Sequence, residues 1–148
     1  MSRHRSSESG FTLIELLIVV AVIGIVAAIA MIQYGGALDK AKQRSTMADM
    51  RTISRALEAY VVDNHRVPAD TGGVAMLSTI LIPYQINVVP QHDHWGNSYN
   101  FTSNAFDSYT LESFGKDGAD GANVSYSTRM DFFLDIVVSD GLFVAAPE

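Results

Sequence analysis

A long apolar run occupies the N-terminal part of the chain. Its most apolar stretch, Leu16 to Ile32, is 17 residues long, and the residues from Phe11 to Ile14 extend it. A run of this length is near the lower limit for a membrane-spanning helix. One carboxylate, Glu15, interrupts the run close to its start. The pattern therefore predicts a transmembrane helix that carries an acid near one end.

The pattern becomes amphipathic over residues 37–66. Apolar side chains then recur at intervals of three or four residues: Met47, Met50, Ile53, Leu57 and Tyr60. This spacing places them on one face of a helix. No proline occurs from Phe11 to Arg66, so we expect one helix of about fifty residues, roughly 80 Å long. Asn64, which tolerates a left-handed conformation, and the following Pro68 predict its end.

The remaining residues, 67–148, change to short segments typical of β-structure. One helical turn is expected from Val74 to Leu81. Three segments rich in aromatic and β-branched residues follow: SYNFT (98–102), SYTLESF (108–114) and DIVVSDGLFVA (135–145). The Ser-Asp-Gly sequence inside the last segment predicts a hairpin turn. We therefore expect an α+β fold, in which a long and partly transmembrane N-terminal helix packs on a small antiparallel β-sheet.

Composition and charge exclude several functions. The 148 residues carry a formal net charge of −6, which argues against nucleic-acid binding. The chain has no cysteine, so disulfides and thiolate chemistry are excluded. It also lacks a nucleophile elbow, a phosphate loop and an HExxH pair, and we do not expect an enzyme. The acids are unevenly distributed, because ten of them stand against two bases from Val67 onward.

The string Gly10-Phe11-Thr12-Leu13-Ile14-Glu15 resembles the processing site of class III signal sequences. Type IV pilins and the pseudopilins of type II secretion share this site. The resemblance implies that a prepilin peptidase removes residues 1–10 by cutting between Gly10 and Phe11, and that Phe11 is then N-methylated. It also implies a single-pass protein of the bacterial inner membrane with its C-terminal domain in the periplasm. The basic residues on both sides of the apolar run leave this orientation open.

Glu15 has a physical explanation within this resemblance. An acid inside a membrane span costs about 2.5–3.5 kcal/mol and usually marks a functional position. Cleavage after Gly10 would create an α-amine four residues before Glu15. In a filament the amine of one subunit could pair with Glu15 of a neighbour, where water is excluded. The simpler alternative is that Glu15 only reaches the membrane interface; we expect it to act in assembly.

Three downstream stretches extend the resemblance. ALEAYVVDNHRVP (56–68), PQHDHWGNSYNF (90–101) and SFGKDGADG (113–121) resemble a helix end, a D-P-W-G-N-P-Y segment and an S-x-G-x-D-G loop of major pseudopilins. The resemblance implies a type IV pilin-like fold. The expected parts are a cleaved leader (1–10), a transmembrane and filament-core helix (11–36), an amphipathic helix (37–66) and a globular β domain (67–148).

The resemblance also implies a function. We expect a structural subunit that polymerises with itself into a periplasmic pseudopilus and so drives type II protein secretion. Its implied partners are minor pseudopilins, the inner-membrane assembly platform and the prepilin peptidase. One alternative is a pilin of a surface fibre used in adhesion, motility or DNA uptake. Another is a monomeric, membrane-anchored binding module.

The resemblance of residues 113–121 to the stretch that opens the calcium-binding loop of major pseudopilins implies a structural calcium ion, which takes six to eight oxygen ligands. Matched residue by residue, Asp117 corresponds to the aspartate of the glycine-flanked motif and Asp135 to the last acid before the final strand. Asp120 and Asp131 are secondary candidates, because the connecting stretch is longer here than in the family and Leu134 stands where the family has one of two adjacent acids. The alternative is an acidic, solvated turn without a metal.

Two histidines suggest a different metal site. His92 and His94 flank Asp93, and residues two apart on a strand share a face, so both imidazoles could reach one ion. The family resemblance instead implies a structural turn, with Trp95 packed on the sheet.

Overall fold

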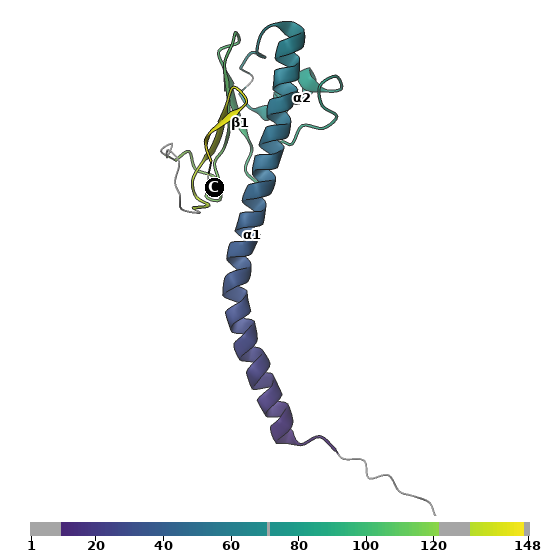
Figure 1. Ribbon diagram of the computed structural model, residues 1–148, viewed down its shortest axis with the longest axis vertical. Helices are drawn as coiled ribbons and strands as arrows, with labels where there is room; N and C mark the ends of the chain where they lie inside the picture. Colours follow the sequence, from purple (N-terminus) through teal and green to yellow (C-terminus); the bar gives the residue numbers. More distant parts are fainter. Residues whose placement is uncertain (1–9, 71, 122–130, 147–148) are drawn as a thin grey trace, which may run out of the picture. The chain divides into compact units, whose positions relative to one another are not determined.

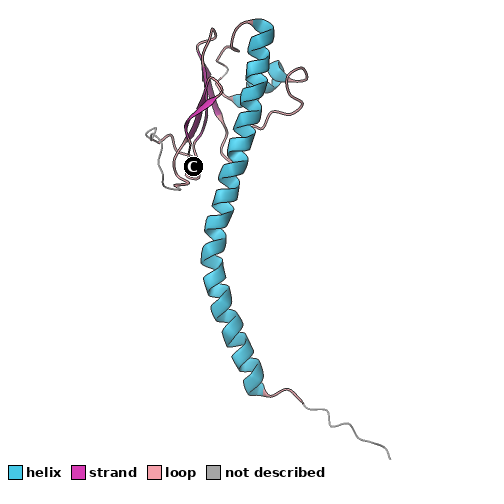
Figure 2. Ribbon diagram, in the orientation of Figure 1, coloured by secondary structure: helices cyan, strands magenta, loops and turns pink. Residues whose placement is uncertain are grey.

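The computed structural model describes residues 10–70, 72–121 and 131–146. Residues 1–9, most of the expected leader, and 122–130 lie outside the described residues. The elements are α1 (Leu13–Asn64), α2 (Val74–Leu81), β1 (Asn100–Ser103), β2 (Tyr109–Ser113), β3 (Ile136–Ser139) and β4 (Leu142–Ala145), shown in Figures 1 and 2. The predicted α+β fold, with a long N-terminal helix and a small antiparallel sheet, is confirmed. The chain divides into two compact units, one ending at Ala37 and one beginning at Leu38.

The first unit contains the apolar part of α1. The helix includes an 18-residue window with a mean hydropathy of 3.0, and none of that window is buried. Its large apolar side chains are exposed along its length. Near the two ends of this stretch, for example, Leu13 is 88% exposed and Ile32 is 83% exposed. By length and composition this segment can cross a membrane. Such a continuous apolar surface requires lipid or other protein chains as its surroundings.

The second unit is built on the amphipathic part of α1. Met50, Ile53 and Leu57 are fully buried, as their spacing predicted, while Met47 and Tyr60 lie at the margin of the core. The sheet lies along one side of this helical segment in Figure 1. The fully buried core residues of α2 and the sheet are Val74, Leu77, Leu81, Phe101, Leu111, Ile136 and Val138, and Val67, Val89 and Tyr99 join them from the connecting segments. Each large apolar side chain buried in this way contributes about 1.5–3 kcal/mol.

The four strands form an antiparallel meander in the order β1-β2-β3-β4. Phe101 of β1 pairs with Leu111 of β2, which pairs with Val138 of β3. These three side chains therefore stand side by side on the face that meets α1. The predicted hairpin is confirmed, because Asp140 and Gly141 connect β3 to β4 with φ angles of 49° and 84°. Positive φ at both positions is the signature of a type I′ turn.

The end of α1 differs from the prediction in one detail. The helix ends at Asn64 as expected, but the left-handed residue is His65, with a φ of 55°. Asn64 remains helical, and its Nδ2 donates to the carbonyl oxygen of Tyr60 at 3.0 Å. The asparagine side chain thus satisfies one of the last helical carbonyls, and the chain reverses one residue later.

Candidate functional site

The start of α1 is held by reciprocal hydrogen bonds between Thr12 and Glu15. Glu15 Oε2 accepts from the Thr12 backbone N–H at 2.9 Å and from its hydroxyl at 2.7 Å. The Glu15 backbone N–H donates to Thr12 Oγ1 at 3.3 Å. This arrangement is a capping box, with Thr12 as the N-cap and Glu15 as the third helical residue. The T-x-x-E spacing of these two residues is the local sequence signal of such a box.

The capping box gives Glu15 a partner within its own chain. A negative charge is favoured at a helix N-terminus, where backbone N–H groups lack helical acceptors. The carboxylate is therefore held at the N-terminal end of the helix, directly after Phe11. Gly10 precedes the helix, and a side chain at that position would have no heavy atom within 4 Å. Phe11 is 74% exposed. Hence the Gly10–Phe11 bond is accessible within the described residues.

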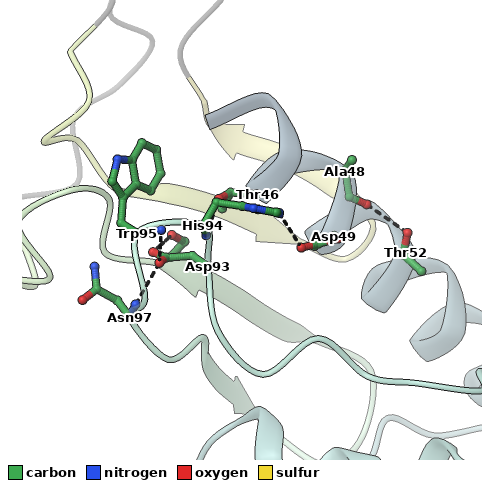
Figure 3. Close-up of polar contacts among 9 residues, drawn as sticks. Thr46, Ala48, Asp49, Thr52, Asp93, His94, Trp95 and Asn97 are labelled. Atoms are coloured by element: carbon green, nitrogen blue, oxygen red, sulfur yellow. Dashed lines mark hydrogen bonds and ion pairs between the residues drawn. The ribbon is translucent and has the colours of Figure 1, made fainter. Parts of the chain in front are cut away.

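A tight turn over residues 92–98 is organised by a buried carboxylate. Asp93 is only 5% exposed. Its Oδ1 accepts from the backbone N–H of Trp95 at 2.9 Å and from that of Asn97 at 2.8 Å, as Figure 3 shows. Its Oδ2 accepts from the Ser113 hydroxyl at 2.9 Å. Both oxygens are thus satisfied, which is the condition for burying a carboxylate at acceptable cost.

This turn is fastened to α1 through His94. The His94 Nε2 lies 3.1 Å from Asp49 Oδ2, and the His94 backbone N–H donates to Thr46 Oγ1 at 3.2 Å (Figure 3). His92 is exposed and forms an isolated bridge with Ser98. Among the described residues, the group of side chains able to hold a metal includes neither histidine. The positions of these side chains fit a structural turn.

Asp39 connects the same turn and the loop after β2 to α1. Trp95 Nε1 donates to Asp39 Oδ1 at 3.3 Å, a contact that the sequence did not predict. Lys116 Nζ donates to Asp39 Oδ2 at 2.7 Å. The Lys116 ammonium holds the pKa of the Asp39 carboxyl below its usual value. Lys116 also lies 5.7 Å from the ring centre of Phe133, within reach of a cation–π interaction.

Gly115 brings the two halves of the loop after β2 together. Its φ is +63°, and a Cβ there would lie 2.8 Å from the carbonyl oxygen of Leu134 and 2.9 Å from that of Phe132. The next residue, Lys116, donates its backbone N–H to the Phe132 carbonyl at 2.8 Å. Only glycine allows this close approach of two backbones. The segment 115–121 is thereby held beside the segment 131–135.

Three acidic side chains lie close together beside these two segments. One carboxylate oxygen from each of Glu112, Asp120 and Asp135 lies within 4.8 Å of the others. Asp135 is 7% exposed; its Oδ2 accepts from the Gly121 backbone N–H at 3.0 Å, and its Oδ1 has no hydrogen-bond partner among the described residues. Burial raises the pKa of Asp135, the Gly121 N–H opposes the rise, and the neighbouring acids add to it. An unpartnered buried carboxylate oxygen among acids is suited to a hard cation.

The structure brings together only some of the acids that the sequence suggested as calcium ligands. Asp135 and Asp120 share the cluster. Asp117 Oδ1 accepts from the Ala119 backbone N–H at 3.3 Å, and Asp131 Oδ1 accepts from the Phe133 backbone N–H at 3.1 Å. Sequence reasoning missed Glu112, because its place depends on the pairing of β2 with β3, where it lies opposite Val137. No local sequence motif predicts that strand pairing.

Two family models match the chain. Residues 33–128 match the model described as type II secretion system (T2SS), protein G. Residues 5–31 match the prokaryotic N-terminal methylation motif. The second match contains Gly10, Phe11 and Glu15.

Curated relatives are similar over most of the chain. The type II secretion system core protein G of Pseudomonas aeruginosa is 33% identical over 131 residues, which cover 78% of this chain and 90% of the relative. The protein of the same name from Vibrio cholerae is 31% identical over 127 residues, covering 77% and 86%. That from Escherichia coli K12 is 30% identical over 129 residues, covering 80% and 89%.

Proposed function

This chain belongs to the family of type II secretion system protein G, and we propose that it is a structural subunit that polymerises into a periplasmic pseudopilus. The observation that carries the proposal is the apolar half of α1, which has no buried residue in its most apolar window, while the second unit has a complete core of its own. A helix of this kind suits both a membrane and the centre of a helical filament. The family match favours this role over a surface pilin or a monomeric anchored module.

We infer that the chain is processed at Gly10 and methylated at Phe11. The match to the N-terminal methylation motif supports this inference, as does the exposure of the bond. After cleavage, the α-amine of Phe11 would lie next to the capping box. In a filament the amine of a neighbouring subunit could bind Glu15, since Thr12 offers it only neutral hydrogen-bond donors and a buried carboxylate without an opposite charge is costly.

The proposed location follows from the same features. The apolar part of α1 anchors the subunit once in the inner membrane, with the second unit in the periplasm before and after assembly. Minor pseudopilins, the inner-membrane assembly platform and the prepilin peptidase are the proposed partners. The role is structural, and no catalytic chemistry is assigned to any residue of the chain.

We also propose a structural calcium ion at the acidic cluster. Glu112, Asp120 and Asp135 would hold it, and the feature that fits a cation is the Oδ1 of Asp135, which no other described residue contacts through a hydrogen bond. Bound calcium would neutralise the mutual repulsion of these acids and tie the loop after β2 to the start of β3. Asp117 and Asp131 stay proposed as further ligands, because they belong to the two loop segments that meet there.

Mass spectrometry of assembled subunits tests the processing step. The full chain is expressed with a prepilin peptidase and the assembly machinery, and fibres are sheared from the cells. We expect the N-terminal peptide to begin at a methylated Phe11. The variant Gly10→Val should remain uncut and absent from fibres, whereas Ser9→Ala should behave like the wild type. Fibres made of uncut chains would contradict the proposal.

A further inference from the structure

A concave site lies between α1 and the β3–β4 hairpin, inside the second unit. Its volume is about 310 Å³. Arg51, Arg55 and Glu58 line it from the helix, and Gly141, Leu142 and Phe143 line it from the hairpin. Neither the acidic cluster nor the start of α1 contributes to it. The site therefore has no part in the function described so far.

The two arginines bring positive charge to this site that no ion pair among the described residues neutralises. They are one helical turn apart, and both are exposed. Among the described residues, neither guanidinium forms an ion pair, since the two ion pairs present join His94 to Asp49 and Lys116 to Asp39. Each of the two guanidinium groups can bind a carboxylate through two parallel hydrogen bonds.

An aromatic ring of the hairpin holds one of the two arginine side chains in place. The Arg51 guanidinium carbon lies 5.0 Å from the ring centre of Phe143, a cation–π contact that orients it. Glu58 lies directly over Gly141, where a Cβ would collide with its Oε1. With two arginines and one glutamate, the site keeps a net positive charge. Leu142 at its edge is 72% exposed, which adds an apolar contact surface.

The rest of the chain offers the complementary charge. Residues 40–66 contain six bases, whereas residues 67–148 contain ten acids and only two bases. One of those two bases, Lys116, is already paired with Asp39. Several of these acids are exposed and outside any ion pair among the described residues, including Asp107 and Asp117. The Arg51/Arg55 pair of one copy is thus complementary in charge to the acidic β domain of another.

We propose that Arg51 and Arg55 of one copy bind carboxylates on the acidic β domain of the next copy in the filament. This inference rests on the proposed polymerisation and names a contact that such a polymer uses. A second copy is the favoured occupant because it combines carboxylates with a protein surface that can cover Leu142 and Phe143. A phospholipid phosphate would satisfy the arginines alone.

Charge reversal tests the proposal in the full-length chain with its assembly machinery. Arg51→Glu/Arg55→Glu is compared with Arg44→Glu/Arg66→Glu, which changes the net charge equally at exposed positions outside the site. We expect sheared fibres to fall about tenfold for the first variant, at equal subunit levels in the membrane, and to stay near wild type for the second. Equal fibre yields for the two variants would overturn the inference and leave the proposed function intact. A wild-type chain that forms no fibres would overturn both.

A charge-preserving variant keeps the test valid if charge reversal prevents folding. Arg51→Lys/Arg55→Lys supplies amines that a zero-length carbodiimide can couple to carboxylates in contact with them. Isolated fibres are treated, and cross-linked multimers are digested and mapped by mass spectrometry. We expect the introduced lysines to be joined to acids within residues 67–148 of another copy, with no such products from Arg44→Lys/Arg66→Lys. Introduced lysines without cross-links in intact fibres, as lipid occupancy would give, would overturn the proposal.

Discussion

The surroundings of Asp39 and Asp135 shift the pKa values of these two carboxyl groups in opposite directions. The Lys116 ammonium lowers the pKa of Asp39, so its contribution to stability is present above the ordinary aspartate pKa and is lost as the pH falls through its lowered pKa. Burial raises the pKa of Asp135. Its contribution is therefore present below the ordinary pKa and is lost as the pH rises through the raised one. At neutral pH, Asp135 is a charge that the fold tolerates at a cost.

The variant Asp135→Asn should reveal that cost. Its amide can keep the bond from Gly121 and can donate to Glu112 or Asp120, so without calcium we expect stability at pH 7 to rise by about 1 kcal/mol. Calcium at millimolar concentration should raise the melting temperature of the wild type but not that of the variant. Thermal melts of the full chain in detergent, with and without a chelator, measure both effects.

Asp107→Asn provides the matched control, because it removes one exposed acid outside the cluster. It should leave the calcium response unchanged. If calcium stabilises Asp135→Asn as much as the wild type, the cluster is not the binding site.

The elements of this fold differ in how far local sequence determines them. The helical turn Val74–Leu81, the Asp140-Gly141 turn and the buried stripe of α1 were predictable, because spacing and turn residues act within a few positions. The link from Lys116 to Asp39 spans 77 residues. It depends on how the sheet packs on the helix, which no local pattern specifies. The residue-level match to a known family supplied Asp117 and Asp135 as candidates, and of these two only Asp135 belongs to the cluster of Glu112, Asp120 and Asp135 in the described residues.

The β3–β4 turn offers a test of one such element. Gly141→Ala places a side chain at a φ of +84° and against Glu58, so we expect a loss of about 1–3 kcal/mol. Adding Glu58→Ala to the Gly141→Ala chain should restore the part of the stability that is lost to the collision. The part that is lost to backbone strain should remain. Unfolding followed through the fluorescence of Trp95, the one tryptophan of the chain, measures the change.

Gly36→Ala is the control for this turn. It lies in α1 with no heavy atom within 4 Å of an added Cβ, and alanine favours a helix by up to about 1 kcal/mol over glycine. A Gly141→Ala protein as stable as the wild type would contradict the structural reading of the hairpin.

At the scale of the whole molecule, the two units have opposite requirements. The second unit buries a core drawn from α1, α2 and all four strands. The first exposes a continuous apolar helix that water does not stabilise. Lipid can cover this helix before assembly and neighbouring helices can cover it afterwards. Glu15 is the charged group in the described part of that segment, and its proposed pairing with the amine of a neighbouring subunit would favour the filament over lipid.

Secretion by the bacterium that carries this chain tests the account most directly. The gene is deleted, and the fraction of a type II-secreted protein retained in the periplasm is measured. We predict that most of the cargo is retained, that the wild-type chain restores its release, and that Glu15→Leu does not, whereas Asp63→Asn, which removes an exposed acid at the end of α1, does. Cargo release that is unaffected by the deletion, or that Glu15→Leu restores in full, would contradict the claim that this chain builds the secretion pseudopilus through Glu15.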